Sequence, residues 1–364
     1  MHQADEILLH IGFAKTGTTA IQRLLFAHKE ELLAQGVLWP GEDDNHYHLR
    51  SIISDDAATQ IQIRRLGLSD EGVPLFLAEW REKIEAEIRA TKPKRILFST
   101  EYLNGAAQHE LRRLASFLKQ FSPRIRVLAY VRDPWSMAIS ATQEEVRTGL
   151  SPAPVSLAQD VRFNDAIERF KIGLCQELEI RAYQDDVVLN FLEWADISIA
   201  YERAPRVNRS MGLYTACLLA ELNRHYPAFD ETGAFLGDHS RGWMAECIAE
   251  AFEDEPPIRM NKRTAAAIEE LIRSDLDALR RTYFGGREVF PRNEERFSDD
   301  PDDTLHLGRL DTSTATAGLF AAMRGLSDRA IHYFLESQRL RQELEAAKEG
   351  ASTASPPPPL TPSS

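Results

Sequence analysis

The amino-acid sequence predicts an α/β fold in three layers, with helices on both faces of a mostly parallel sheet and a helical C-terminal lobe. Three short apolar runs carry this prediction: EILLHI at 6–11, RILFST at 95–100 and IRVLAYV at 125–131. Continuous apolar runs are typical of strands that are buried on both faces of a sheet. Leucines with helical spacing lie between the second and third runs, at 108–121, and this alternation of strand and helix favours parallel strands.

The order of segments predicts four parts of the chain. We expect an α/β core over residues 1–210, a helical accessory part of the same domain over 211–330, and a charged helix over 331–349. Residues 350–364, GASTASPPPPLTPSS, have the composition of a disordered tail, because proline, serine and threonine cannot furnish a hydrophobic core.

Composition and charge exclude several classes of protein. The 364 residues are 43% hydrophobic, enough for a large core, and the formal net charge of −13 argues against nucleic acid or anionic lipid as the main partner. The three cysteines have no paired spacing that would indicate a disulfide framework or a zinc site. The N-terminus lacks the basic region of a secretory signal, and no apolar stretch approaches the roughly 20 residues of a membrane helix. We therefore expect a cytoplasmic protein that does not span a membrane.

A phosphate-binding loop is predicted where the first apolar run ends. The run stops at Gly12 and a helical pattern starts near Thr18, so the segment is a strand, a turn and a helix. Such a turn directs unpaired backbone N–H groups and the positive end of the helix dipole at one point. Loops that bind ATP or GTP place lysine directly after the last glycine, whereas Lys15 here precedes Gly17. The alternative interpretation is a glycine turn that only caps a helix.

The order Lys-Thr-Gly-Thr-Thr at 15–19 resembles the 5′-phosphosulfate loop of the sulfotransferase superfamily, although Ala14 stands where that family usually has proline. The resemblance implies a P-loop NTPase-like fold that binds 3′-phosphoadenosine 5′-phosphosulfate (PAPS), releases adenosine 3′,5′-bisphosphate and needs no metal. It also implies that the lysine stabilises charge on the leaving phosphate. The implied contacts to the 5′-phosphate and the sulfonate are Lys15, Thr16, Gly17, Thr18 and Thr19.

A second anion site is implied after the third apolar run. Members of the superfamily hold the 3′-phosphate with an arginine at the end of a later strand and a serine on the following helix. The matching residues here are Arg132, before a proline that suits the first helical position, and Ser140, with Ser136 as a nearer alternative. Taken alone, the Arg-Asp-Pro sequence is also typical of an ordinary capped helix with a surface ion pair.

A third segment resembles the superfamily more loosely. Residues 206–210, Arg-Val-Asn-Arg-Ser, are similar to an Asn-x-Ser stretch found late in many bacterial sulfotransferase-like proteins. This resemblance implies that Arg209 contributes to nucleotide binding. An exposed basic turn is the alternative.

Transfer of a sulfonate to a hydroxyl requires a base that accepts the proton of the acceptor. Glu101 directly follows the run RILFST, at the end of the strand where open α/β sheets bind their ligands. Cytosolic members of the superfamily carry a catalytic histidine at a similar place, so the residue type differs here. His48, with its neighbour His46, is the alternative base because histidine titrates near neutral pH.

The predicted function is transfer of a sulfonate from PAPS to a hydroxyl or amine. Residues 275–286 resemble the C-terminal part of bacterial members that act on glycans, which implies carbohydrate sulfation and a glycan or other small-molecule acceptor. Two alternatives stay open. One is a P-loop nucleotide or small-molecule kinase, disfavoured because no lysine follows Gly17. The other is a nucleotide-binding relative that has lost its activity.

Overall fold

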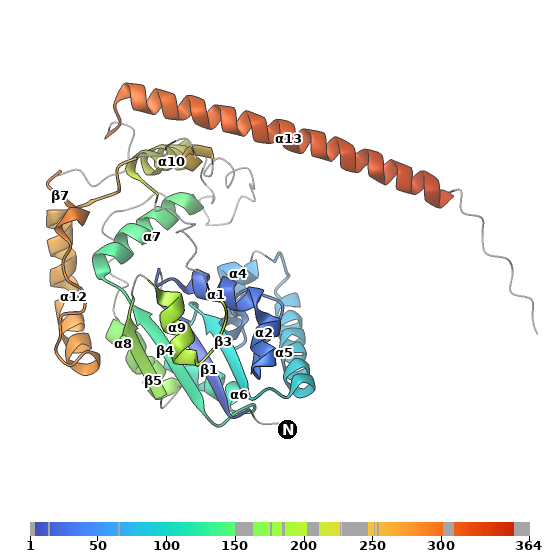
Figure 1. Cartoon of the computed structure of the whole chain (residues 1–364), viewed down its shortest axis with the longest axis vertical. Helices are drawn as coiled ribbons and strands as arrows, with labels where there is room; N and C mark the ends of the chain where they lie inside the picture. Colours follow the sequence, from blue (N-terminus) through green and yellow to red (C-terminus); the bar gives the residue numbers. More distant parts are fainter. Residues whose placement is uncertain are drawn as a thin grey trace, which may run out of the picture. The chain divides into compact units, whose positions relative to one another are not determined.

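The chain forms two compact units in the computed structural model (Figure 1). The first unit comprises residues 1–142, 153–209 and 259–303, and the second comprises 143–152, 210–258 and 304–364. The structure describes residues 4–13, 15–64, 66–149, 163–174, 177–183, 186–201, 211–225, 227, 247–250, 252, 255–300 and 309–352.

A five-stranded parallel sheet in the order β2-β3-β1-β4-β5 forms the centre of the first unit. The strands are β1 (Glu6–Gly12), β2 (Val37–Leu38), β3 (Arg95–Thr100), β4 (Ile125–Val131) and β5 (Glu177–Ala182). The predicted α/β class is confirmed, and each of the three apolar runs forms a strand. β1 is buried along its whole length, as expected for the central strand of such a sheet.

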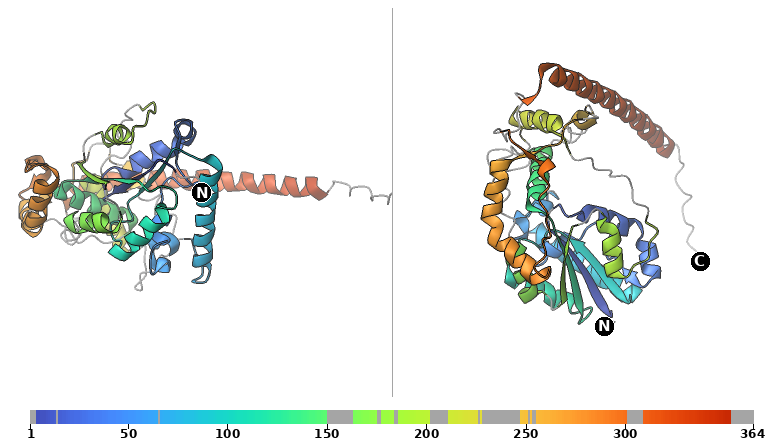
Figure 2. Two further views of the ribbon diagram at one scale, coloured as in Figure 1. Left: turned by 90° about the horizontal axis from the view of Figure 1, so that it is seen from below. Right: turned by 60° about the vertical axis from the view of Figure 1, so that its left-hand side comes forward.

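Helices cover both faces of this sheet, because alternate side chains of each strand point to opposite sides (Figure 2). Ile7, Leu9 and Ile11 pack in one hydrophobic cluster, and Leu8 packs in another. The first cluster contains residues of α5 (Gly72–Thr91), α6 (Gln108–Leu118), α8 (Phe163–Gly173) and α12 (Lys262–Tyr283). The second contains residues of α1 (Thr18–Ala27), α2 (Lys29–Ala34) and α9 (Val187–Ala195).

The helical pattern that starts near Thr18 forms two helices, since the chain leaves helical geometry at His28, whose φ is −113°. Residues 259–303 of the expected accessory part belong to the first unit, together with the α/β core. The physical reason is the apolar stripe of α12, which is buried in the cluster on one face of the sheet.

Short elements connect β2 to α5 in the first unit. They are α3 (His48–Ser51), η1 (Ala57–Thr59) and α4 (Ile61–Arg64). The backbone N–H of His46 donates to the carbonyl of Ser99 at 3.0 Å, so this connection starts against the end of β3. After β4, α7 (Pro134–Thr148) begins at the predicted proline. Two short strands, β6 (Met260–Asn261) and β7 (Phe297–Ser298), form a small parallel pair. In the sequence, β6 directly precedes α12, and η3 (Glu294–Arg296) directly precedes β7.

The described part of the second unit is mainly helical, with α10 (Leu213–His225) and the long α13 (Thr312–Ser352). Its core includes Val146, Cys217, Leu219 and Ile248. The charged helix expected at 331–349 is the C-terminal half of α13, and residues 353–364 of the expected tail lie outside the described residues. Among the described helices, none combines the length and the apolar character that crossing a bilayer requires.

Candidate functional site

The ends of three neighbouring strands meet at one edge of the central sheet. Ile11 of β1 is paired with Thr100 of β3, and Gly12 is paired with Tyr130 of β4. Glu101 directly follows β3, and Arg132 directly follows β4. The chain leaves β1 toward β2 on one side of the sheet, whereas β4 leads to β5 on the other. Ligands of open α/β sheets bind at such a switch point.

Two side chains tie the loop after β1 to its neighbours. Asn104 Nδ2 donates to the carbonyl of Gly12 at 2.7 Å and to the carbonyl of Glu101 at 3.0 Å. On the other side, Arg132 Nη1 donates to the carbonyl of Lys15 at 2.7 Å. The loop is therefore held from both adjacent strands.

The loop contains two residues with left-handed backbone conformation. Lys15 has φ 63° and Gly17 has φ 80°. Glycine adopts this region without strain, whereas a residue with a Cβ rarely does so outside turns and ligand sites. A Cβ on Gly17 would also lie 2.6 Å from Val187 Cγ1, so α9 packs too closely to allow another side chain there. Backbone conformation and close packing both require glycine at position 17.

Thr18, the first residue of α1, presents a buried hydroxyl. The residue is 3% exposed, and its Oγ1 has no hydrogen-bond partner among the residues that the structure describes. A Cβ on Gly12 would fall 1.9 Å from this oxygen, so only glycine at position 12 accommodates it. Leaving a buried hydroxyl without a partner costs about 1–3 kcal/mol. Its place beside the unpaired N–H groups of a helix N-terminus suits an anion that accepts from both.

The other two threonines of the loop have different surroundings. Thr16 is fully buried, and its Oγ1 donates to the carbonyl of Phe13 at 2.7 Å, so its hydroxyl closes the turn. Thr19 is exposed on the first turn of α1. The three hydroxyls of the motif therefore have different environments: one is used inside the turn, one is buried without a partner, and one faces solvent.

Arg132 is held in place by the loop and by an aromatic ring. Its guanidinium carbon lies 4.9 Å from the centre of the Tyr183 ring, in addition to the bond from Nη1 to the carbonyl of Lys15. Tyr183 also lies beside the loop, because a Cβ on Gly17 would be 3.1 Å from its Cε2. The aromatic ring therefore fixes the guanidinium beside the phosphate-binding loop.

The first turn of α7 contains the second buried hydroxyl of this region that has no described partner. Asp133 Oδ1 accepts from the N–H of Ser136 at 2.8 Å and so caps the helix, and its carboxylate pairs with Arg296 at 3.3 Å. Ser136 Oγ is buried without a partner among the described residues. Ser140 is half-buried and lies one turn further on the same helix face. Both candidate serines therefore follow Arg132 on one side of α7.

His46 is fully engaged within the fold. Its Nδ1 accepts from the N–H of Ser99 at 3.0 Å, which assigns the ring proton to Nε2, and Nε2 lies 2.9 Å from the carbonyl of Pro40. Burial lowers the pKa of His46 to about 4. Because both nitrogens are satisfied by backbone groups, these contacts favour a structural role.

His48 lies within a stack of aromatic rings. Its ring is 4.9 Å from that of Trp80 at 13° and 3.8 Å from that of Tyr47 at 28°. Burial lowers the pKa of His48 to about 4, so the imidazole is neutral at pH 7. Its Nδ1 lies 3.5 Å from Asp43 Oδ2, and with a neutral ring this contact is not an ion pair. The packing favours a structural role for His48 as well.

Glu101 lies at the strand edge itself, half-buried, with its carbonyl held by Asn104. Of the residues predicted for the site, the structure thus brings the loop, Glu101 and Arg132 to one sheet edge. Arg209 lies outside the described residues. In the described part of the chain, no group of three or more His, Cys, Asp or Glu side chains is arranged to hold a metal ion.

Sequence reasoning missed two residues that contact the loop, Asn104 and Tyr183, and a buried polar residue of β1, His10. His10 is fully buried, with Nδ1 2.8 Å from Ser99 Oγ, and burial lowers its pKa to about 3. The signal that could have found His10 is a polar residue inside an otherwise apolar strand, two positions before Gly12. Asn104 and Tyr183 belong to no pattern that the sequence alone distinguishes.

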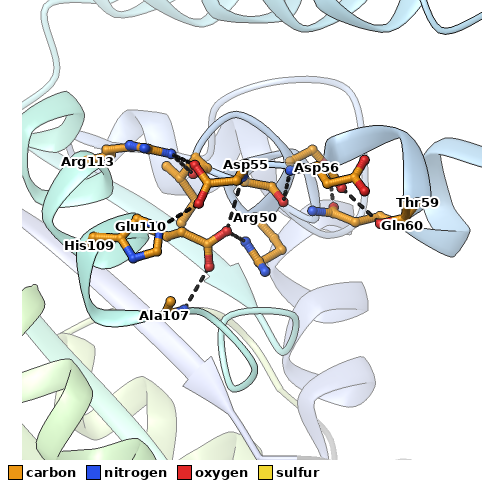
Figure 3. A network of polar contacts seen from close by, with 12 residues as sticks. Arg50, Asp55, Asp56, Thr59, Gln60, Ala107, His109, Glu110 and Arg113 are labelled. Atoms are coloured by element: carbon orange, nitrogen blue, oxygen red, sulfur yellow. Dashed lines mark hydrogen bonds and ion pairs between the residues drawn. The ribbon is translucent and has the colours of Figure 1, made fainter.

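A polar network anchors the connection between β2 and α5 to α6, the helix after Glu101 (Figure 3). The carboxylate of Glu110 accepts from Arg50 Nη1 at 2.7 Å and from the N–H groups of Asp55 at 3.3 Å and Ala107 at 2.7 Å. Asp55 contacts two further side chains of α6, His109 and Arg113. Burial raises the pKa of Glu110, but these hydrogen bonds outweigh it and hold the pKa below its usual value.

A hollow of about 530 Å³ opens within the same connection. It is lined by Asp56, Ala58, Thr59, Ile63, Arg64, Leu68, Asp70 and Val73. Its wall therefore combines carboxylates, a guanidinium and a hydroxyl with aliphatic side chains. Asp56 follows Asp55, so the network of Glu110 fixes this side of the hollow.

Solved structures that are similar to this chain include two sulfotransferases. One is the sulfotransferase domain from the curacin biosynthetic pathway, with a TM-score of 0.31 and 12% identity, covering 55% of this chain and 76% of that one. The other is a sulfotransferase from Alicyclobacillus acidocaldarius, with a TM-score of 0.35 and 13% identity, covering 61% of this chain and 93% of that one. No protein-family model and no curated protein matches the chain.

Glu110→Ala should lower the free energy of unfolding by about 2–3 kcal/mol, because it leaves the half-buried guanidinium of Arg50 and two N–H groups without their acceptor. The lowered pKa means that this stabilisation is present at neutral pH and is lost as the pH falls through it. Urea unfolding at several pH values measures both effects. The exposed pair in α8 provides the control, since Glu168→Ala should change stability by less than about 0.5 kcal/mol. Equal losses for the two variants would contradict the importance of the network.

Thr18→Val should leave the urea midpoint unchanged or raise it, because it removes a buried hydroxyl that has no described partner. The same change should weaken binding of adenosine 3′,5′-bisphosphate at least about tenfold, which corresponds to loss of a hydrogen bond to a charged ligand. Thr16→Val is the matched control, since loss of its bond to Phe13 should lower stability by about 1 kcal/mol. A Thr18→Val protein that unfolds earlier and binds normally would contradict the assignment.

Proposed function

We propose that this protein is a sulfotransferase that uses PAPS as its donor, with the loop at 12–19 holding the 5′-phosphosulfate. The observation that carries the proposal is the buried hydroxyl of Thr18 at the start of α1, which has no described partner. The left-handed backbone conformations of Lys15 and Gly17 turn the loop around the same point. A tetrahedral anion with several acceptor oxygens fits these donors.

Arg132 and α7 support a donor that is phosphorylated at both ends. A guanidinium has five N–H donors in a planar fork, so Arg132 can hold the carbonyl of Lys15 and still bind a phosphate. Ser136 Oγ is buried without a described partner, and Ser140 follows on the same face. We assign Arg132 to the 3′-phosphate, with Ser140 or Ser136 as the hydroxyl that accompanies it. Arg209 is proposed as a further contact on the resemblance of its segment alone.

Different residues at the sheet edge have different roles in the proposed sulfonate transfer. PAPS, when bound, supplies an activated sulfonate. The ammonium of Lys15 and the first N–H groups of α1 stabilise negative charge on the departing phosphate oxygen. Glu101 accepts the proton of the attacking hydroxyl, because it follows β3 directly and Asn104 links its backbone to Gly12.

His48 is the alternative base, and its surroundings favour Glu101 instead. The imidazole of His48 is 3% exposed and stacked between Trp80 and Tyr47. Its lowered pKa of about 4 makes it a weak proton acceptor at pH 7. His46 has both nitrogens bonded to backbone groups.

We propose a glycan, or another small polyhydroxylated molecule, as the acceptor. The hollow lined by Asp56, Thr59, Arg64 and Asp70 offers carboxylates and a guanidinium that can bond to sugar hydroxyls, beside aliphatic side chains. The connection that contains this hollow also contacts the end of β3, where the N–H of His46 donates to the carbonyl of Ser99, two residues before Glu101. The resemblance of residues 275–286 to glycan-modifying members points to the same class.

A kinase is the main alternative activity, and its dependence on magnesium separates the two. In ATP-binding loops the lysine follows the last glycine and a hydroxyl binds magnesium. In this chain the lysine precedes Gly17. Turnover of PAPS in the presence of a chelator supports the sulfotransferase, whereas magnesium-dependent ATP turnover supports the kinase. Nucleotide binding without turnover of either donor supports an inactive relative.

Glu101→Gln should lower the rate of sulfonate transfer at least about 100-fold, the contribution expected of a general base. Binding of adenosine 3′,5′-bisphosphate should change by less than about threefold, because the carboxylate acts on the acceptor. The comparison variant is His48→Gln, which should retain activity. Transfer that survives Glu101→Gln and fails in a folded His48→Gln protein would reassign the base to His48.

Arg132→Ala should weaken binding of adenosine 3′,5′-bisphosphate at least about 100-fold, since it removes a charge-assisted contact. Adenosine 5′-monophosphate is the control ligand, and its binding should weaken far less, because it lacks the 3′-phosphate to which Arg132 is assigned. Calorimetric titration of both ligands measures the difference. An equal loss for the two ligands would show that Arg132 only braces the loop.

A further inference from the structure

α13 is far longer than the helices of an ordinary globular core. It spans Thr312–Ser352, 41 residues, and is drawn as one uninterrupted helix in Figure 1. At a rise of 1.5 Å per residue this corresponds to about 60 Å. A helical pattern longer than about 25 residues is typical of coiled coils. The length of α13 therefore indicates that another helix covers part of its surface.

The sequence of α13 contains a heptad pattern. Residues spaced alternately four and three apart fall on one stripe, which we call the seam. The seam positions are Leu319, Met323, Leu326, Ala330, Tyr333, Ser337, Leu340, Leu344 and Ala347. In heptad terms these are alternating d and a positions over about four heptads. Seven of the nine are apolar, and the serine and tyrosine lie near the middle.

Most of the described side chains of the seam are exposed, and Leu326 is half-buried. Leu319 is 45% exposed, Met323 is 62% exposed and Tyr333 is 44% exposed. Phe320, at a position that flanks the seam, is 67% exposed. Burial of such side chains contributes about 25 cal/mol per Å² of apolar surface, so leaving them in water is unfavourable.

A different stripe of the same helix makes its contacts within the second unit. A Cβ on Gly318 would overlap Phe252, a Cβ on Gly325 would lie 3.4 Å from Cys247 Sγ, and Arg329 pairs with Glu250 at 2.7 Å. These residues occupy c and g positions of the heptad, beside the seam and not on it. The helix can therefore pack against its own unit and still offer the seam to a partner.

The charged residues beside the seam favour one relative orientation of two such helices. In a parallel pair, each g position lies against the following e position of the other helix. Glu336 then faces Arg341 of the second copy, and Glu343 faces Lys348. In an antiparallel pair, e positions face e positions, which brings the basic residues at 341 and 348 together. The parallel arrangement pairs both of these basic residues with glutamates instead.

We propose that α13 is a dimerisation helix, and that its seam forms a parallel two-stranded coiled coil with a second copy of this chain. The exposed apolar stripe supplies the buried surface, and the glutamates and basic residues beside it set the orientation. Ser337, a polar residue at an a position, fixes the register, as single polar residues at such positions do. The inference is independent of the nucleotide site.

Sedimentation velocity of the full chain tests the proposal. The wild-type protein should have twice the mass of the 41.2 kDa chain. Met323→Glu should weaken the dimer at least about tenfold, because it places two like charges opposite each other in the seam. Leu335→Glu is the matched control, since Leu335 is 61% exposed on the same helix but lies away from the seam at an f position, and the dimer should persist.

Orientation is tested by cysteine substitution. Ser337→Cys should form a disulfide between two copies under mild oxidation, because equal seam positions face each other only in a parallel pair. The wild-type chain, which has three cysteines of its own, provides the background. A monomeric wild-type protein, equal effects of Met323→Glu and Leu335→Glu, or a dimer without the Ser337→Cys cross-link would each overturn the proposal. Circular dichroism of each variant identifies any that fails to fold.

Discussion

The close approach of the Thr18 hydroxyl to Gly12 is the constraint on which the loop depends. A single Cβ at position 12 would lie 1.9 Å from this oxygen, so glycine lets α1 begin directly over the end of the central strand. The hydroxyl is buried there without a described partner, at a free-energy cost of about 1–3 kcal/mol that a bound anion can offset. In our account, the fold tolerates this buried hydroxyl because the bound ligand supplies its missing hydrogen bond.

The parallel sheet turns this local arrangement into a site with several parts. Because β1 lies between β3 and β4, the residues after those strands, Glu101 and Arg132, must lie on either side of the loop. Asn104 and Arg132 then bond to its backbone and hold it in place. Residues that directly follow neighbouring strands are thus held close together, which is why α/β sheets bind ligands at this edge.

The sequence predicted β1, β3 and β4 and the positions of the loop and of the residues that follow these strands, because buried parallel strands form continuous apolar runs. It did not predict β2, which is only two residues long. It could not predict the surroundings of His46 and His48, whose burial comes from residues distant in the chain such as Phe98 and Trp80. Nor could it place α12, because an amphipathic stripe shows which face is buried but not against what. Asn104 was missed for a related reason: one asparagine in a polar turn carries no pattern.

The central claim, that this site binds an adenosine nucleotide phosphorylated at both the 3′ and 5′ positions, is tested most directly by calorimetric titration of the wild-type chain. Adenosine 3′,5′-bisphosphate should bind without magnesium and at least about tenfold more tightly than adenosine 5′-monophosphate, because only the bisphosphate engages both anion sites. Equal affinity for the two ligands, or tighter binding of ATP with magnesium, would contradict the account.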